Sequence, residues 1–263
     1  MSTSEIVSQY VKDVLSGDMI SCKTTIQAVK KYERERARVG KDGWQFTFDE
    51  AAASRACGFF PALLRHSVGE FAGSPFMLSP WQSFIVWNVF GWKRFDASRR
   101  FRKVFLSVAR KNGKSTFCAG LAILLGAADN EPGAQVFIGA TKLDQARIIH
   151  QESCRMLNQS PYIGKHATIL KDNISFDVSD SFIRPLGSDK PFDGLNPSAT
   201  FFDELHAWKE HHRKFFDTMV TGSGSRIQPL QVAITTAGDE KSEIYHEEAN
   251  YSRGVIAGDI TDD

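Results

Sequence analysis

The feature that most constrains this chain is an apolar run at residues 104–108, followed by a polar loop and by Gly113-Lys114-Ser115 at the start of a second apolar run. This order predicts a β-strand, a phosphate-binding loop and an α-helix. In such a P-loop, helix N-terminal N–H groups face a β-phosphate, the lysine reaches the β- and γ-phosphate oxygens, and the serine hydroxyl binds Mg²⁺. The loop departs from the pattern G-x-x-x-x-G-K-[ST] at its first position, where Val108 replaces glycine.

The loop itself supplies the expected nucleotide-binding residues. Arg110 and Lys111 could contact phosphates, although charges in a loop can equally be solvated. The full set expected to bind the nucleotide here is Arg110, Lys111, Asn112, Gly113, Lys114, Ser115 and Thr116.

Two acids follow a second apolar run at residues 199–202. One carboxylate in such a position holds Mg²⁺ and its neighbour orients the attacking water. Asp203 is the expected metal ligand, beside Ser115, because it lies nearer the carboxyl edge of the sheet, where ligands bind; Glu204 is then the general base. Taken alone, an Asp-Glu pair at a strand end is also compatible with a surface turn.

A third strand-like run, at residues 230–234, ends in Thr235-Thr236-Ala237-Gly238. Hydroxyl groups beside a γ-phosphate could report its presence to the rest of the fold. The alternative is a plain exit from strand to turn.

From residue 104 onward, short apolar runs alternate with helical patterns, which indicates an α/β fold with a mainly parallel sheet flanked by helices. We expect strands at 104–108, 135–140, 199–203 and 230–235, and a hairpin of 174–178 with 181–186. Helices are expected at 114–127, 143–157, 210–220 and 241–251.

The first 90 residues read as helical. Capping boxes are expected at Ser2-x-x-Glu5, before a helix that ends at Gly17, and at Thr47-x-x-Glu50, before a short helix that ends near Gly58. A helix over about 24–39 and one over 81–90, capped by Ser79-Pro80, complete this part. We therefore expect an N-terminal helical segment at 1–70, a P-loop core at 71–253 and the start of a linker at 254–263.

Composition excludes several classes of protein. The chain is 42% hydrophobic and 24% charged, as expected of a soluble globular protein. Its longest nearly uncharged apolar run, 117–128, is too short to cross a bilayer, and no signal-peptide pattern precedes it. The four cysteines are expected to be reduced thiols of a cytosolic protein.

Charge is distributed unevenly despite a formal net charge of +1. The last 25 residues hold eight acids and two bases. Residues 93–114 hold one acid, Asp96, and nine bases, so that one face could bind a polyanion. The nine are Lys93, Arg94, Arg99, Arg100, Arg102, Lys103, Arg110, Lys111 and Lys114.

Taken together, five segments within residues 45–253 resemble the ATPase domain of tailed-bacteriophage terminase large subunits. This resemblance implies an additional-strand, RecA-like P-loop ATPase that drives double-stranded DNA into a preformed capsid. The segments are Pro80-Trp81-Gln82, the loop Arg110 to Ser115, Asp193-Gly194-Leu195-Asn196-Pro197, Phe202-Asp203-Glu204-Leu205-His206 and Thr235-Thr236-Ala237-Gly238.

The resemblance also implies residue roles. Gln82 matches an adenine-reading glutamine, Lys114 and Ser115 the Walker A lysine and metal ligand, Asp203 and Glu204 the Walker B pair, and Thr235, Thr236 and Ala237 a coupling motif. The expected ligands are ATP and Mg²⁺. The expected partners are double-stranded DNA, the small terminase subunit, the procapsid portal and further copies in a ring, in the host cytoplasm and with no membrane.

Full-length members of that family carry a C-terminal nuclease domain, whereas this chain ends about 25 residues after the coupling motif, so nuclease activity is not expected. Motors of this class usually take an arginine from a neighbouring subunit. Arg226, after the Gly- and Ser-rich stretch 221–225, is the first candidate, with Arg213 and Arg184 as alternatives.

Two alternatives remain from the residues alone. Asp203-Glu204-Leu205-His206 also spells the Asp-Glu-x-His string of a helicase superfamily, but the 27 residues after Thr236 cannot form a second RecA-like domain. The other alternative is a nucleotide-dependent scaffold in a DNA-handling complex that does not hydrolyse the nucleotide.

Overall fold

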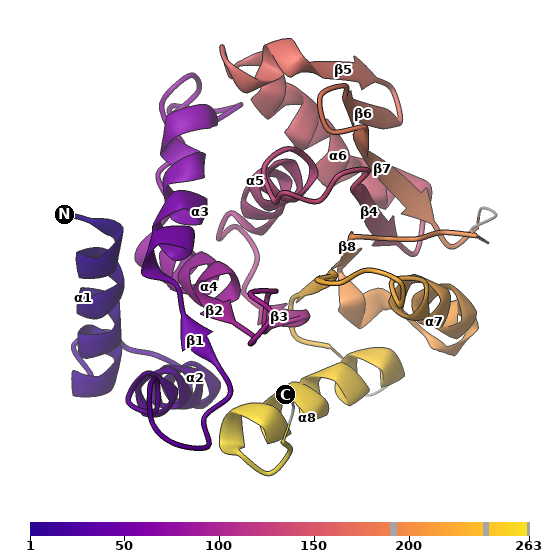
Figure 1. Ribbon diagram of the computed structural model, residues 1–263. Coiled ribbons are helices and arrows are strands. Elements are labelled where there is room, and N and C mark those ends of the chain that lie inside the picture. Colours follow the sequence, from indigo (N-terminus) through magenta and orange to yellow (C-terminus); the bar gives the residue numbers. More distant parts are fainter. Residues whose placement is uncertain (190–193, 239–241, 262–263) are drawn as a thin grey trace. The chain divides into compact units, whose positions relative to one another are not determined.

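The structure is a computed structural model that describes residues 1–189, 194–238 and 242–261. It forms two compact units that alternate along the chain (Figure 1). Unit 1 comprises Met1–Pro61, Met77–Phe101 and Ala249–Asp263, and unit 2 comprises Ala62–Phe76 and Arg102–Glu248. The domain boundaries near residues 70 and 253 stay a prediction. Among the described helices, none has the length and apolarity to cross a membrane.

Unit 2 is built on a seven-stranded sheet of order β3-β9-β8-β4-β7-β6-β5. The first five strands in this order are parallel, and β6 and β5 continue the sheet antiparallel. Because β9 lies between β3 and β8, the sheet has the additional strand that the resemblance implies, and the mainly parallel α/β fold is confirmed. The strands are β3 (Lys103–Ser107), β4 (Gln135–Ala140), β5 (Ala167–Leu170), β6 (Asn173–Phe176), β7 (Ser181–Gly187), β8 (Ala199–Asp203) and β9 (Leu230–Thr235).

The expected hairpin is present as β6 and β7, with Ile174 paired to Ile183. Its second strand also pairs in parallel with β4, which joins the hairpin to the main sheet. Strand β5 was not predicted from the sequence. It has only four residues, it lies at the sheet edge, and none of its side chains is fully buried, so its apolar pattern is weak.

Helices α5 (Lys114–Ala127) and α6 (Leu143–Asn158) pack against each other and on β4 and β7. Helix α7 (Arg213–Thr221) lies on the other side of the sheet (Figure 1). Phe202 of β8 contacts Trp208 and, from α7, Phe216. The helix expected at 210–220 begins instead as a 3₁₀ turn, Glu210–His212. The helix expected at 241–251 is α8, Glu243–Ala257; residue 241 lies outside the described residues.

Unit 1 contains α1 (Thr3–Ser16), α2 (Lys23–Arg36), most of α3 (Glu50–Leu63) and α4 (Pro80–Gly91), and the short antiparallel pair β1 (Thr47–Phe48) and β2 (Trp92–Lys93). The first capping box is confirmed: Ser2 N–H donates to Glu5 Oε2 (2.7 Å) and Glu5 N–H donates to Ser2 Oγ (3.3 Å). Helix α2 ends three residues before the predicted boundary at residue 39.

The second predicted capping box is wrong. Thr47 lies in β1, where it pairs with Lys93, so its backbone is extended. The cap is Asp49, whose Oδ1 accepts the Ala52 N–H at 2.8 Å. Helix α3 also continues through Gly58 to Leu63, so a glycine within it does not end it.

Candidate active site

The loop after β3 has an unusual backbone. Lys111 and Gly113 both adopt left-handed conformations, with φ of 66° and 72°. Gly113 caps α5, whose first turn begins at Lys114. The N–H of Val108 donates to the Thr235 carbonyl at 3.0 Å and ties the loop to β9. Since the first N–H groups of a helix have no partner within it, this end of α5 can bind an anion.

Lys114 lies across this loop. Its Nζ donates to the Val108 carbonyl at 3.0 Å and lies 3.9 Å from Glu204 Oε1, and the side chain is mostly buried. Asn112 uses its amide within the loop, donating to the Ala109 carbonyl at 3.1 Å. Arg110 and Lys111 are exposed, and Ser115 and Thr116 are half-buried at the start of α5. The loop therefore offers backbone amides and one poised ammonium group.

Asp203 ends β8 and is 5% exposed. Its Oδ2 accepts a hydrogen bond from Gln145 Nε2 at 3.0 Å. Burial, supplemented by the nearby charge of Glu204, raises the pKa of Asp203 to about 6, against the opposing effects of Gln145 and Lys114. A buried carboxylate with so little compensating charge favours a bound cation.

The oxygen ligands available here fit Mg²⁺ better than a metal ion whose whole coordination shell comes from protein side chains. Within the described ranges, no group of three or more His, Cys, Asp or Glu side chains could hold a metal ion. Mg²⁺ typically takes one or two protein oxygens and completes its shell with water and substrate phosphates. The Asp203 carboxylate and the Ser115 hydroxyl are donors of that kind.

Glu204 adopts a left-handed backbone, with φ of 47° and ψ of 54°. A non-glycine residue in this region is strained by roughly 1–3 kcal/mol, and such strain is concentrated at functional sites. The flanking groups hold it: Trp208 Nε1 donates to the Asp203 carbonyl (2.9 Å) and Ala207 N–H to the Glu204 carbonyl (2.8 Å). The turn directs Glu204 toward Lys114 rather than along the strand.

His206 lies beside Glu204, although the residues alone predicted no role for it there. Its Nδ1 lies 3.2 Å from Glu204 Oε2 and 3.1 Å from Thr235 Oγ1. The hydroxyl of Thr236 is 3.3 Å from the same nitrogen, and Ala237 follows it, exposed. The Asp-Glu-x-His spacing was visible in the sequence, but only the strand order brings His206 to the end of β9.

The sheet assembles these groups at one edge. Ser107 of β3 pairs with Thr235 of β9, and Ile234 of β9 pairs with Asp203 of β8. The phosphate loop, the acid pair and the two threonines thus follow the carboxyl ends of three adjacent parallel strands, where ligands bind in open α/β sheets.

Gln82 belongs to unit 1, whereas the phosphate loop belongs to unit 2. Its Oε1 accepts the Ser79 N–H at 2.9 Å, which completes the start of α4, and the side chain is buried. The Ser79-Pro80 helix start is confirmed. A role toward adenine stays a prediction for Gln82.

Arg226 does not have the freedom that the sequence analysis expected of it. Its Nη1 pairs with Glu131 at 3.0 Å, Nη2 donates to the Gly133 carbonyl (3.0 Å), and Nε donates to the Asn196 carbonyl (3.2 Å). The side chain is 13% exposed. A role of Arg226 toward a neighbouring chain therefore stays a prediction, and it would require all these bonds to break.

The alternatives are also engaged within the chain. Arg213 makes two hydrogen bonds to Glu247, at 2.7 and 2.8 Å. Arg184 donates to Asn173 Oδ1 at 2.7 Å and lies over the ring of Phe182. The identity of a trans-acting arginine stays open among these three.

We expect Arg226→Ala to lower the free energy of unfolding by about 2 kcal/mol, because it leaves Glu131 and two backbone carbonyls without their donor. Arg184→Ala is the matched control, with an expected loss of about 0.5 kcal/mol or less at an exposed position. Urea unfolding of both variants measures the difference. If Arg226→Ala were as stable as the parent, and regained ATPase activity when mixed with a Glu204→Gln chain, Arg226 would be free to act in trans.

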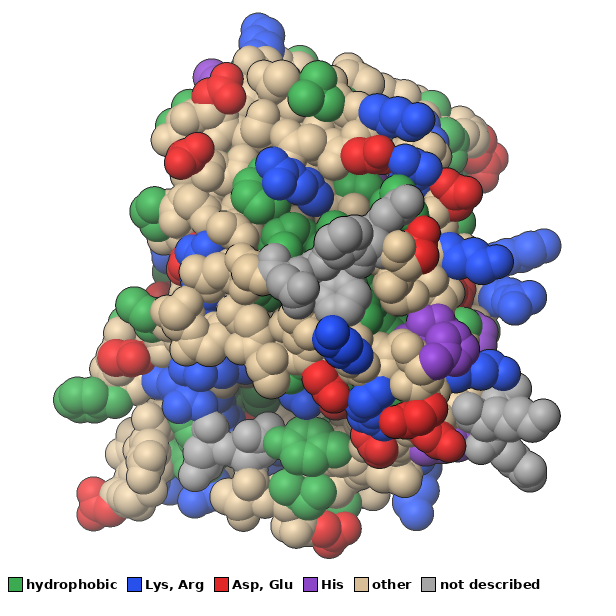
Figure 2. Space-filling view, turned by 90° about the vertical axis from the view of Figure 1, so that its right-hand side faces the viewer, with side chains coloured by type: hydrophobic (Ala, Val, Ile, Leu, Met, Phe, Trp, Pro, Cys, Tyr) green, Lys and Arg blue, Asp and Glu red, His purple; other side chains and the backbone are tan. Residues whose placement is uncertain are grey.

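The stretch at 93–114 contributes less positively charged surface than its nine basic residues suggest. Arg99 and Arg100 are buried, and Arg100 makes two hydrogen bonds to Glu35, at 2.8 and 3.1 Å. Lys103 pairs with Glu248 at 3.1 Å. On the face in Figure 2, basic and acidic side chains are interspersed. The prediction of one strongly basic face is weakened accordingly.

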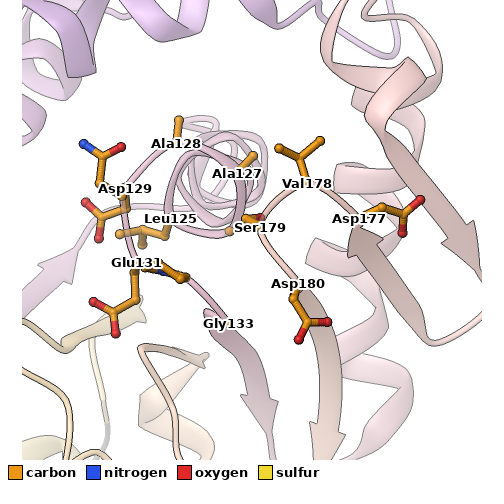
Figure 3. A pocket seen from close by; sticks show the side chains of 13 residues that line it. Leu125, Ala127, Ala128, Asp129, Glu131, Gly133, Asp177, Val178, Ser179 and Asp180 are labelled. Carbon is orange, nitrogen blue, oxygen red and sulfur yellow. The ribbon is translucent and has the colours of Figure 1, made fainter.

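A hollow of about 760 Å³ lies in unit 2 between residues 125–133 and 177–180. It is at the C-terminal end of α5, opposite to the phosphate loop. Figure 3 shows Asp129 and Glu131 on one side of it and Asp177 and Asp180 on the other. Four carboxylates repel phosphates, so this hollow is not the nucleotide site.

A profile of the family described as "Terminase large subunit, ATPase domain" matches residues 80–254. The chain belongs to this family. The match includes the phosphate loop, the acid pair and the threonine segment, and it confirms the resemblance identified from the residues. Neither the helicase nor the scaffold alternative finds support in the comparisons.

The large terminase subunit of Enterobacteria phage HK97 is 26% identical over 181 residues, which are 67% of this chain and 35% of that protein. The crystal structure of the HK97 large terminase superposes with a TM-score of 0.63 at 23% identity, covering 76% of this chain and 42% of that one. The large terminase ATPase domain of Thermus phage P74-26 gives a TM-score of 0.44 at 19% identity, with 54% and 62% covered. The chain thus spans about a third of the curated relative and less than half of the HK97 structure.

Proposed function

We propose that this terminase ATPase domain hydrolyses ATP at the edge formed by β3, β9 and β8, and that hydrolysis drives double-stranded DNA into a viral procapsid. The observation that carries the proposal is the approach of Lys114 to Glu204, with Nζ 3.9 Å from Oε1 across the site. This pair places a phosphate-binding cation beside a carboxylate that can activate water.

In this proposal the phosphates are bound by the loop amides together with Arg110, Lys111 and Lys114. Asn112 and Gly113 shape the loop, and Thr116 lies in the first turn of α5. Ser115 and Asp203 would hold Mg²⁺, which neutralises charge that develops on the transferring phosphoryl group. Glu204 accepts a proton from the attacking water. Gln145 keeps one oxygen of Asp203 engaged and so leaves the other for the metal.

The partners proposed for the full-length protein follow from the family. They are double-stranded DNA, the small terminase subunit, the procapsid portal and further copies of the chain in a ring, in the host cytoplasm. The HK97 relative is itself described as a terminase large subunit. Nuclease activity is not part of the function proposed for residues 1–263.

The direct test is phosphate release from ATP by the purified chain, with Mg²⁺ and after removal of Mg²⁺ by EDTA. We expect release only with Mg²⁺, because Ser115 and Asp203 cannot neutralise the developing charge themselves. In the full-length protein with procapsids, the parent should protect DNA from added nuclease in an ATP-dependent manner. A chain that releases no phosphate, alone or in that assembly, would refute the proposal.

Gln82→Ala should weaken ATP binding more than GTP binding, because a glutamine amide can both accept from and donate to the adenine edge. Fluorescence titration with labelled ATP and GTP measures the ratio of the two affinities. Because Gln82 also caps α4 by accepting the Ser79 N–H, the melting temperature of Gln82→Ala is the control for loss of that cap. An equal loss for both nucleotides would exclude adenine reading by Gln82.

A further inference from the structure

The imidazole of His206 lies between three oxygen atoms. Its Nδ1 is 3.2 Å from Glu204 Oε2, 3.1 Å from Thr235 Oγ1 and 3.3 Å from Thr236 Oγ1. The first oxygen belongs to the acid pair after β8, and the other two belong to the end of β9. One ring nitrogen carries either a proton or a lone pair, so it cannot bond fully to all three at once.

Hydrogen bonds hold the main chain of His206 in place. A change in which of these oxygens pairs with Nδ1 can therefore come only from movement of side chains. The His206 N–H donates to Thr235 Oγ1 at 3.1 Å, and the His206 carbonyl accepts from Ser242 Oγ at 2.6 Å. Leu205, beside it, is fully buried. The Glu204 and His206 side chains, by contrast, are 28% and 25% exposed, and the Oε2 atom of Glu204 is buried without a hydrogen bond to hold it.

Two basic side chains flank Glu204, but its buried Oε2 accepts no hydrogen bond in the described structure. Lys114 Nζ approaches Oε1 at 3.9 Å and His206 Nδ1 approaches Oε2 at 3.2 Å. A phosphate bound at the loop competes with Glu204 for Lys114, because the same ammonium group serves both. Once the phosphate has taken the lysine, the His206 imidazole still lies beside the unpaired Oε2 and can donate to it in place of a threonine hydroxyl.

We propose that His206 is a positioning residue that links the orientation of Glu204 to the hydroxyl groups of Thr235 and Thr236. The inference rests on the proposed function, since it takes Glu204 as the base. With Nδ1 protonated, the carboxylate is the strongest of the three acceptors, because a charge-assisted hydrogen bond is roughly twice as strong as a neutral one. When Glu204 turns to the attacking water, Nδ1–H donates to a threonine hydroxyl instead, and the end of β9 responds.

The first arm of the test is steady-state ATP hydrolysis by the chain with His206→Ala and His206→Asn. We expect His206→Ala to lower kcat by about 10- to 100-fold, the cost of a misplaced reacting group, with KM changed by less than about twofold. His206→Asn should recover most of kcat, because its amide N–H lies near the position of Nδ1. His166→Ala, at an exposed histidine, is the control.

The second arm is a double-mutant cycle with Thr236→Val, which keeps the shape of Thr236 and removes its hydroxyl. If His206 acts through Thr236, His206→Ala with Thr236→Val should be no slower than His206→Ala alone. Thermal unfolding of all four chains separates this coupling from loss of stability. Multiplicative losses in kcat would contradict the link to Thr236.

The third arm is hydrogen exchange of residues 230–238 with and without adenylyl imidodiphosphate, which does not require hydrolysis. The parent should show an analogue-dependent change in this segment, and His206→Ala should lose it while residues 108–116 remain protected. Hydrolysis by the parent with unchanged kcat in His206→Ala overturns this inference alone. If the parent does not hydrolyse ATP, the proposed function is overturned. The link between His206 and the end of β9 is then tested by hydrogen exchange alone, and an analogue-dependent change at residues 230–238 that persists in His206→Ala refutes it.

Discussion

Glu204→Gln is expected to lower the rate of ATP hydrolysis by about 10²- to 10⁴-fold while leaving ATP binding close to that of the parent. The amide keeps the size of the side chain and can still occupy the space beside Lys114, 3.9 Å away, but it cannot accept a proton from water. Phosphate release under single-turnover conditions gives the rate, and titration with a fluorescent ATP analogue gives the affinity.

Glu210→Gln is the matched control for this prediction. Glu210 is an exposed acid of the same type, six residues further along the chain and 3.7 Å from Arg213, so its substitution should leave hydrolysis unchanged. Hydrolysis at the parent rate by Glu204→Gln would show that another group takes the proton. The assignment of Asp203 and Lys114 would not depend on that outcome.

Lys114→Ala should lower ATP affinity by about 10- to 100-fold and the hydrolysis rate by about 10²- to 10³-fold, because it removes a charge-assisted contact with the phosphates. The parent lysine already lies over the loop, donating to the Val108 carbonyl at 3.0 Å, so little ordering is needed on binding. Binding is measured by the same titration, and hydrolysis by phosphate release.

Two controls separate loss of the charge from loss of the loop. Lys165→Ala removes an exposed lysine distant in sequence and should leave both binding and hydrolysis unchanged. The melting temperature of Lys114→Ala should stay near that of the parent, since within the described residues the Lys114 ammonium group makes one hydrogen bond, to a loop carbonyl, and only a 3.9 Å contact with Glu204. Parent-like affinity in a folded Lys114→Ala chain would refute the phosphate role of this residue.

Local patterns predicted much of this protein. The strand, loop and helix around Gly113-Lys114-Ser115, the acids after β8 and the capping box at Ser2 and Glu5 all depend on residues within a few positions of one another. Such signals act through backbone hydrogen bonds and short-range sterics, so they are present in any linear stretch of the sequence. The mainly parallel sheet followed from the alternation of these elements.

Where a local signal failed, a distant partner decided the conformation. Thr47 has the spacing of a helix cap, but pairing with Lys93 makes it a strand residue. Arg226 follows a Gly- and Ser-rich stretch that predicts mobility, yet Glu131, 95 residues away in the sequence, holds it in place. An ion pair or a β-bridge between such distant segments has no characteristic residue spacing, so it cannot be predicted from a local pattern in the sequence.

The sequence by itself thus determined the chemistry proposed for the site: a phosphate loop with Lys114, and an acid pair at a strand end. The tertiary structure alone decided how these parts are connected, because the insertion of β9 between β3 and β8 brings Thr235 against His206 across 29 residues of sequence. The parallel sheet converts residues that are far apart in the chain into neighbours at one edge, and only there does His206 lie beside both Glu204 and Thr235.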